Sequence, residues 1–143
     1  TCAAHALLCE DIREEISGRF TLVGVFADDL TVKKIPSNIR LCIMCWMDYS
    51  EESEPESLDV VIDALGEVRE FPLEQNLLDA AREDAKRSYE NGVLAKVGIN
   101  IKLASLPVNK EGVISVYFNT GKGRFLAGQV FVTQKVPEEL PSK

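Results

Sequence analysis

The side chains that could hold a metal or attack a substrate are few: one histidine, His5, and the cysteines Cys2, Cys9, Cys42 and Cys45. Cys42 and Cys45 have the Cys-x-x-Cys spacing of zinc knuckles and dithiol redox sites, which place both thiols on a turn or at a helix start. Here two apolar residues separate them inside an apolar run, where positions i and i+3 of a strand point to opposite faces. We therefore interpret both as buried thiols.

Cys2, His5 and Cys9 could offer three metal ligands. In a strand, His5 and Cys9 share one face and Cys2 lies on the other, and the single histidine leaves a fourth protein ligand lacking. As a general base, His5 needs a carboxylate and a nucleophile; Glu10 and Asp11 are near, but no nucleophile-elbow sequence accompanies them. We expect no enzyme, no metal site and no cofactor. The alternative is a metal-dependent or His-based enzyme using His5, Cys9 and the nearby acids.

The run from Glu10 to Glu15 places five charged residues within six positions, next to a predicted hairpin turn. A solvated turn whose charges pair with one another gives this pattern, and we favour that interpretation. A recognition loop gives the same pattern. If the sequence marks a binding site at all, we predict it at Glu10, Asp11, Arg13 and Glu14.

Two further motifs carry charge without the spacing of a known site. Residues 51–56 hold four glutamates, but they lack the alternating acids and the glycine of a shaped calcium loop. Residues 120–124 hold two glycines and two bases, as a phosphate-binding loop does, but such a loop joins a strand to a helix. Here both flanking segments have strand character. We predict a solvated loop and a hairpin turn.

The elements that position these residues are mostly strands, because apolar residues recur with period two between turn residues. One segment, near residues 76–90, is rich in helix formers with a thin apolar stripe and predicts a surface helix. About seven or eight strands with one helix indicate a mainly β fold: an antiparallel β-sandwich, Ig-like or jelly-roll-like. A partly closed barrel is the rival. The expected strands lie near residues 3–10, 20–26, 39–47, 58–65, 68–73, 93–103, 113–119 and 124–133, and the loop at 27–38 leaves room for a further short strand at 30–33.

Composition narrows the class of protein. The 143 residues are 45% apolar, which suits one domain, here residues 1–136 followed by a flexible tail at 137–143. The net charge of −7 disfavours nucleic acid and anionic membranes as partners. No apolar run is long enough to span a membrane, and the cysteines lie mainly in apolar runs, so we expect reduced thiols and a cytoplasmic location. Residues 48–70 hold nine acids and one base, and any basic partner is expected there.

The segment from Ala4 to Glu15, with the one from Ser17 to Phe26 after it, resembles the start of a family of small uncharacterised proteins of bacteria and their phages. The resemblance implies a single-domain β-sandwich and supplies no catalytic residue. It favours a binding or accessory role. Edge strands in an all-β domain, with no assembled catalytic constellation, predict that this cytosolic protein acts by protein–protein contact, with an unidentified protein partner or as a homo-oligomer. A phage counter-defence protein is a more specific version. A structural subunit, of a virion or another assembly, is a further alternative.

Overall fold

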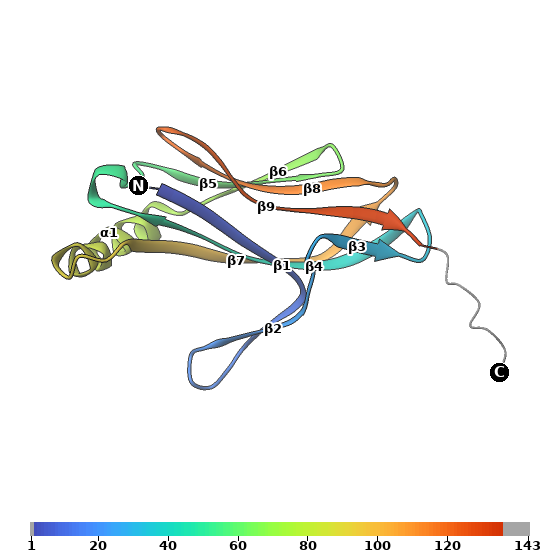
Figure 1. The fold of residues 1–143 in the computed structure, drawn as a ribbon, viewed down its shortest axis with the longest axis horizontal. Helices are drawn as coiled ribbons and strands as arrows, with labels where there is room; N and C mark the ends of the chain where they lie inside the picture. Colours follow the sequence, from blue (N-terminus) through green and yellow to red (C-terminus); the bar gives the residue numbers. More distant parts are fainter. Residues whose placement is uncertain (1, 136–143) are drawn as a thin grey trace.

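The computed structural model describes residues 2–135, so the predicted tail at 137–143 lies outside the described residues. Strands dominate it, in two facing layers with one helix at one end (Figure 1). The predicted mainly β fold and the surface helix are confirmed. The elements in chain order are β1 (Cys2–Glu14), β2 (Phe20–Val25), β3 (Asp29–Val32), β4 (Ser37–Tyr49), a 3-10 turn (Glu51–Ser53), β5 (Leu58–Ala64), β6 (Glu67–Pro72), α1 (Gln75–Glu90), β7 (Ala95–Val108), β8 (Gly112–Thr120) and β9 (Gly123–Gln134).

The strands form two separate sheets. The first has the order β2-β1-β4-β7 and is antiparallel throughout. The second has the order β3-β9-β8-β5-β6, in which β3 runs parallel to β9, against the all-antiparallel prediction, and the other pairs are antiparallel. Because each sheet has two edge strands, the barrel alternative is wrong.

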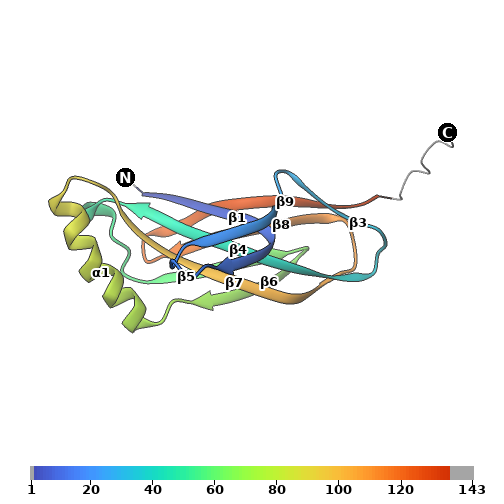
Figure 2. The ribbon, with the colours of Figure 1, turned by 90° about the horizontal axis from the view of Figure 1, so that it is seen from below.

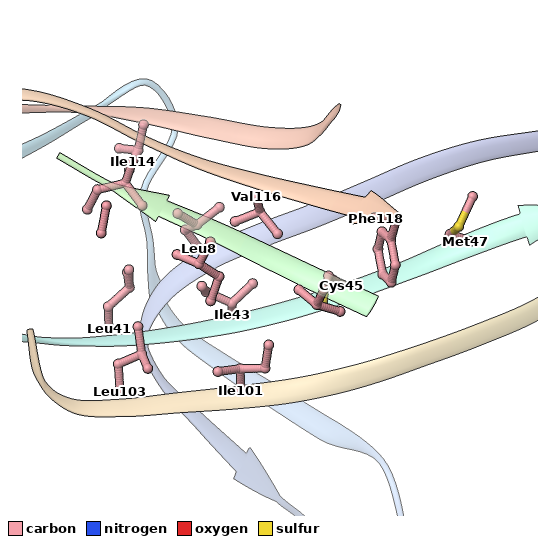
Figure 3. Close-up of a cluster of buried hydrophobic side chains, with 14 of the residues drawn as sticks. Leu8, Leu41, Ile43, Cys45, Met47, Ile101, Leu103, Ile114, Val116 and Phe118 are labelled. Carbon is pink, nitrogen blue, oxygen red and sulfur yellow. The ribbon is translucent and has the colours of Figure 1, made fainter. Parts of the chain in front are cut away.

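One hydrophobic core lies between the sheets. The core-facing side chains of β4 are at most 1% exposed, and Figure 3 shows them beside Val116 and Phe118 of β8. β4 is therefore the central strand that its apolar sequence predicts, flanked by β1 and β7. The fully buried β4 residues on this face are Leu41, Ile43, Cys45, Met47 and Tyr49.

Helix α1 packs against β7 and covers one end of the two layers (Figures 1 and 2). Its apolar stripe is thin, as predicted: Leu78 and Ala85 are its buried residues and join the main core. The helix ends at Asn91 and Gly92, where Gly92 has a φ of 69°, the left-handed conformation that favours glycine. No helix within residues 2–135 has both the length and the apolar character that a membrane crossing requires.

The β1–β2 hairpin, at one edge of the first sheet, bends out of the plane of β4 and β7 and lies beneath their outer face (Figures 1 and 2). It bends where Gly24, with a φ of 65°, faces the side chain of Glu10; a Cβ at Gly24 would lie 2.8 Å from the Glu10 carboxyl group. Under the hairpin is a second, small core, separate from the first. Its buried members are Cys9, Ile12 and Cys42, with Leu22 and Met44 packed against them.

Candidate functional site

A cleft lies between the tip of the β1–β2 hairpin and the outer face of the first sheet. It has a volume of about 440 Å³, within the range of about 300–1,000 Å³ typical of ligand pockets. Phe20 of β2 forms one side, and residues of β4 and β7 form the rest. The wall of the cleft is mainly apolar, and the cleft itself is open to solvent. Its lining residues are Phe20, Met44, Cys45, Trp46, Lys96, Gly98, Ile99 and Asn100.

Gly98 of β7 is one of the residues that line this cleft. It lies directly opposite Trp46 in the β4–β7 ladder. A Cβ at Gly98 would lie 2.8 Å from the Cys45 carbonyl oxygen and 3.0 Å from the Trp46 Cβ, distances that real Cβ atoms rarely reach. The strands can therefore approach this closely because position 98 carries no side chain, and the bare backbone of β7 lies beside the indole.

The indole of Trp46 is held by polar neighbours on the adjacent strands. The His5 ring stacks on it with centroids 5.2 Å apart and an interplanar angle of 25°, and the Lys96 Nζ lies 5.2 Å from the ring centroid. Asp48 links these two neighbours: its Oδ2 lies 3.1 Å from His5 Nε2 and its Oδ1 lies 3.3 Å from Lys96 Nζ. Exposed polar contacts of this kind contribute at most about 1 kcal/mol each. Their main effect is to orient the aromatic wall.

Three of the four residues predicted as a binding site lie together in a different place. Glu10, Asp11 and Arg13 line a second cleft of about 540 Å³ at the base of the hairpin, whereas Glu14 lies nearer the tip, opposite Phe20. Asp11 accepts a hydrogen bond from Arg40 Nη2 at 2.8 Å, and its other oxygen lies 3.6 Å from Arg13 Nε. Asp11 and Arg13 pair with each other, but residues 10–14 belong to strand β1 and not to the solvated turn that the sequence predicted. The binding role of the four residues stays a prediction.

The structure separates His5 from Cys9. His5 lies at the rim of the aromatic cleft, whereas Cys9 is fully buried beneath the hairpin, directly opposite Cys42, and its thiol donates to the Asp11 carbonyl oxygen at 3.3 Å. Burial, and secondarily Cys42, raise the pKa of Cys9. Across residues 2–135 no group of three or more His, Cys, Asp and Glu side chains is placed to hold a metal ion.

Cys42 and Cys45 lie on opposite faces of β4, as their spacing in a strand predicts. Cys42 belongs to the small core under the hairpin and Cys45 to the main core. Burial raises the pKa of Cys45 to about 12, so its thiol stays protonated at neutral pH. A thiolate, which nucleophilic attack and metal ligation both need, is disfavoured at this position.

The aromatic cleft is the feature that sequence reasoning missed. Two signals in the sequence point to it: both faces of β4 are apolar, and Gly98 interrupts an otherwise regular β-strand pattern. By itself, the first signal indicates burial of a central strand. In the structure the outer face of β4 is covered by the hairpin at Cys42 and Met44, and beyond the hairpin tip Trp46 remains partly exposed.

Comparison with protein families places most of the chain in a family. The model of a family of unknown function, DUF6941, matches residues 4–123, which is most of the chain. No curated protein and no solved structure matches it.

Proposed function

We propose that this chain, which belongs to the DUF6941 family, is a non-catalytic binding module that holds a segment of a partner protein in the cleft beneath the β1–β2 hairpin. The observation that carries the proposal is the cleft itself, in which aromatic and apolar side chains from three strands surround a space open to solvent. We propose a cytoplasmic accessory role in a bacterium or phage, which the free, mostly buried cysteines and the resemblance over residues 4–26 support.

The apolar surface extends beyond the cleft. Phe20 at the hairpin tip is 46% exposed, and Leu7, which lies opposite Met44 on the outer face of the first sheet, is also exposed. Protein interfaces combine an apolar centre that takes a large anchoring side chain with a polar rim that stays hydrated. Here Phe20 and Trp46 form the centre, and the Asp48 pairs form the rim. A cleft of about 440 Å³ accommodates an aromatic, leucine or methionine side chain.

The proposal is tested by site-specific crosslinking in the organism that encodes the protein. A photoreactive benzophenone amino acid replaces Phe20 in one variant and Leu126 in the control. Leu126 has a similar exposure, 49%, but lies on β9 of the second sheet. We expect a defined protein adduct from position 20, absent from position 126, and lost when Trp46→Ala is added. Equal crosslinking from both positions, or an adduct that Trp46→Ala leaves unchanged, contradicts the proposal.

A further inference from the structure

The aromatic cleft reaches the edge of the first sheet, because four of its lining residues belong to the edge strand β7. We infer that the partner segment is an extended chain that pairs with β7 as a fifth strand, places a large apolar side chain in the cleft and presents an acidic side chain to Lys102. This inference rests on the proposed function, since it names the partner chemistry of the same cleft.

Of the four edge strands among the described residues, β7 is the best suited to accept another strand. It is 14 residues long, whereas β3 has four residues and β2 has six. β6 ends in Pro72 and carries Arg69 opposite the core-facing Ile62, so that a charge lies on its inner side. Inward charges, prolines and short length are devices that block strand addition. The core-facing side of β7 is instead apolar, and no described strand pairs with its outer edge.

The charge of β7 selects an acidic partner. Although the whole chain has a net charge of −7, the strand from Ala95 to Val108 contains Lys96 and Lys102 and no acid. Asp48 already pairs with Lys96. Within residues 2–135 Lys102 is exposed and takes part in no ion pair of 4.0 Å or less. An acidic side chain opposite Lys102 completes the charge pairing of this face.

Strand geometry fixes the spacing of the partner residues. Lys102, Asn100 and Gly98 point to the same face because side chains alternate along a strand. A chain added to β7 therefore has its acidic residue opposite Lys102 and its large apolar residue two or four positions away, opposite Asn100 or Gly98. The expected pattern is one acidic and one large apolar residue separated by one or three residues.

A second copy of this chain fits the site poorly. If two β7 strands paired about a two-fold axis at Ile99, each Lys96 would lie opposite Lys102 of the other copy, and like charges in opposite positions destabilise a sheet. The side chains brought to the cleft would be those of Gly98 and Asn100, neither of which is apolar. In this register both the charges and the lack of an apolar side chain favour a partner of different sequence.

The test starts from a displayed library of random twelve-residue peptides, selected on the full chain. We expect enriched peptides to carry the acidic–apolar spacing, and we expect a synthetic peptide of this kind to slow amide hydrogen exchange in β7. Lys102→Glu should weaken its binding at least tenfold, whereas Lys135→Glu, an exposed lysine of the second sheet side, should change it less than twofold. N-methylation of alternate peptide amides should abolish binding by removing backbone donors.

The outcomes distinguish the two proposals. A peptide whose binding is lost in Trp46→Ala and Phe20→Ser, but which neither protects β7 nor responds to Lys102→Glu, overturns strand addition and leaves the cleft as a binding site. If the Trp46→Ala and Phe20→Ser variants both still bind the enriched peptides, both proposals are overturned. If no peptides are enriched, the inference of a peptide partner is overturned. It is also overturned if the free protein dimerises in sedimentation experiments and its β7 amides are already protected from hydrogen exchange.

Discussion

Gly98→Ala should destabilise the protein, although replacing glycine by alanine within a strand ordinarily stabilises by about 0.5–1 kcal/mol. The added Cβ would lie 2.8 Å from the Cys45 carbonyl oxygen and 3.0 Å from the Trp46 Cβ. Neither atom is the free end of a flexible side chain, so β4 and β7 must separate or the indole must move. Overpacking of this kind costs about 1–3 kcal/mol. Subtracting the ordinary gain from this cost gives a net loss of stability of about 1 kcal/mol, and at most about 2.5 kcal/mol.

The matched control is Gly123→Ala in the β8–β9 hairpin, where the nearest atoms to an added Cβ are those of the Phe125 ring at 3.8 Å. We expect this variant to be unchanged or more stable by up to about 1 kcal/mol. The assay is urea unfolding followed by circular dichroism and by the fluorescence of Trp46, the one tryptophan of the chain. We expect the free energy of unfolding to fall in Gly98→Ala and to stay the same or rise in Gly123→Ala. We expect the native Trp46 emission to shift in Gly98→Ala alone. A Gly98→Ala protein as stable as the parent would refute the close packing of β7 against Trp46.

Three further predictions follow from burial and charge. The pKa of Cys45 is raised from 9.0 to about 12 in the folded protein, so its thiol stabilises the fold fully below pH 9. This contribution is lost as the pH rises towards 12, because the thiol of the unfolded chain ionises first. Between pH 8 and pH 10.5, the free energy of unfolding measured in urea should therefore fall by about 2 kcal/mol less in Cys45→Ala than in the parent. Ile12→Ala should lower the free energy of local opening of the hairpin by about 2–4 kcal/mol. Amide hydrogen exchange in β2 should then be at least about 30-fold faster, with exchange in β8 unchanged. Equal acceleration in both strands would contradict a separate hairpin core. Asp48→Asn should lower stability by less than about 1 kcal/mol yet shift Trp46 emission, and unchanged emission would deny Asp48 its orienting role.

The strands that sequence reasoning placed well are those whose signals are local. The β8–β9 hairpin follows from glycines between two β-branched, aromatic segments, and the central place of β4 follows from a strand with two apolar faces. The pairing of β3 with β9 joins residues about 100 positions apart, such as Leu30 with Val132, and no local pattern specifies such a contact or its parallel direction. Sequence periodicity therefore gave the elements more readily than their partners.

The same limit explains the predicted site. A run of charges is visible in one segment, so Glu10 to Glu14 stood out, whereas the aromatic cleft is assembled from β2, β4 and β7 and exists because the hairpin bends at Gly24. Phe20 of the hairpin and Trp46 of β4 line this cleft together, although 25 residues lie between them in the sequence. From the sequence, Gly24 indicated a bulge, but the direction in which the hairpin would turn depends on the packing of Ile12 and Leu22 on β4.

The two cores give the cleft unequal walls. β4 and β7 belong to a main core built from both sheets, whereas the hairpin that carries Phe20 is anchored by a cluster with three buried members among the described residues. Segments with few buried apolar contacts open at a lower free energy than the whole domain. The Phe20 side of the cleft can therefore move while Trp46 and Gly98 stay fixed. The rigid wall formed by β4 and β7 sets the register of a bound strand. The mobile wall formed by the hairpin accepts apolar side chains of different sizes. A partner that fills the cleft adds buried contacts to the hairpin, and binding should protect β2 from hydrogen exchange more than any strand of the second sheet.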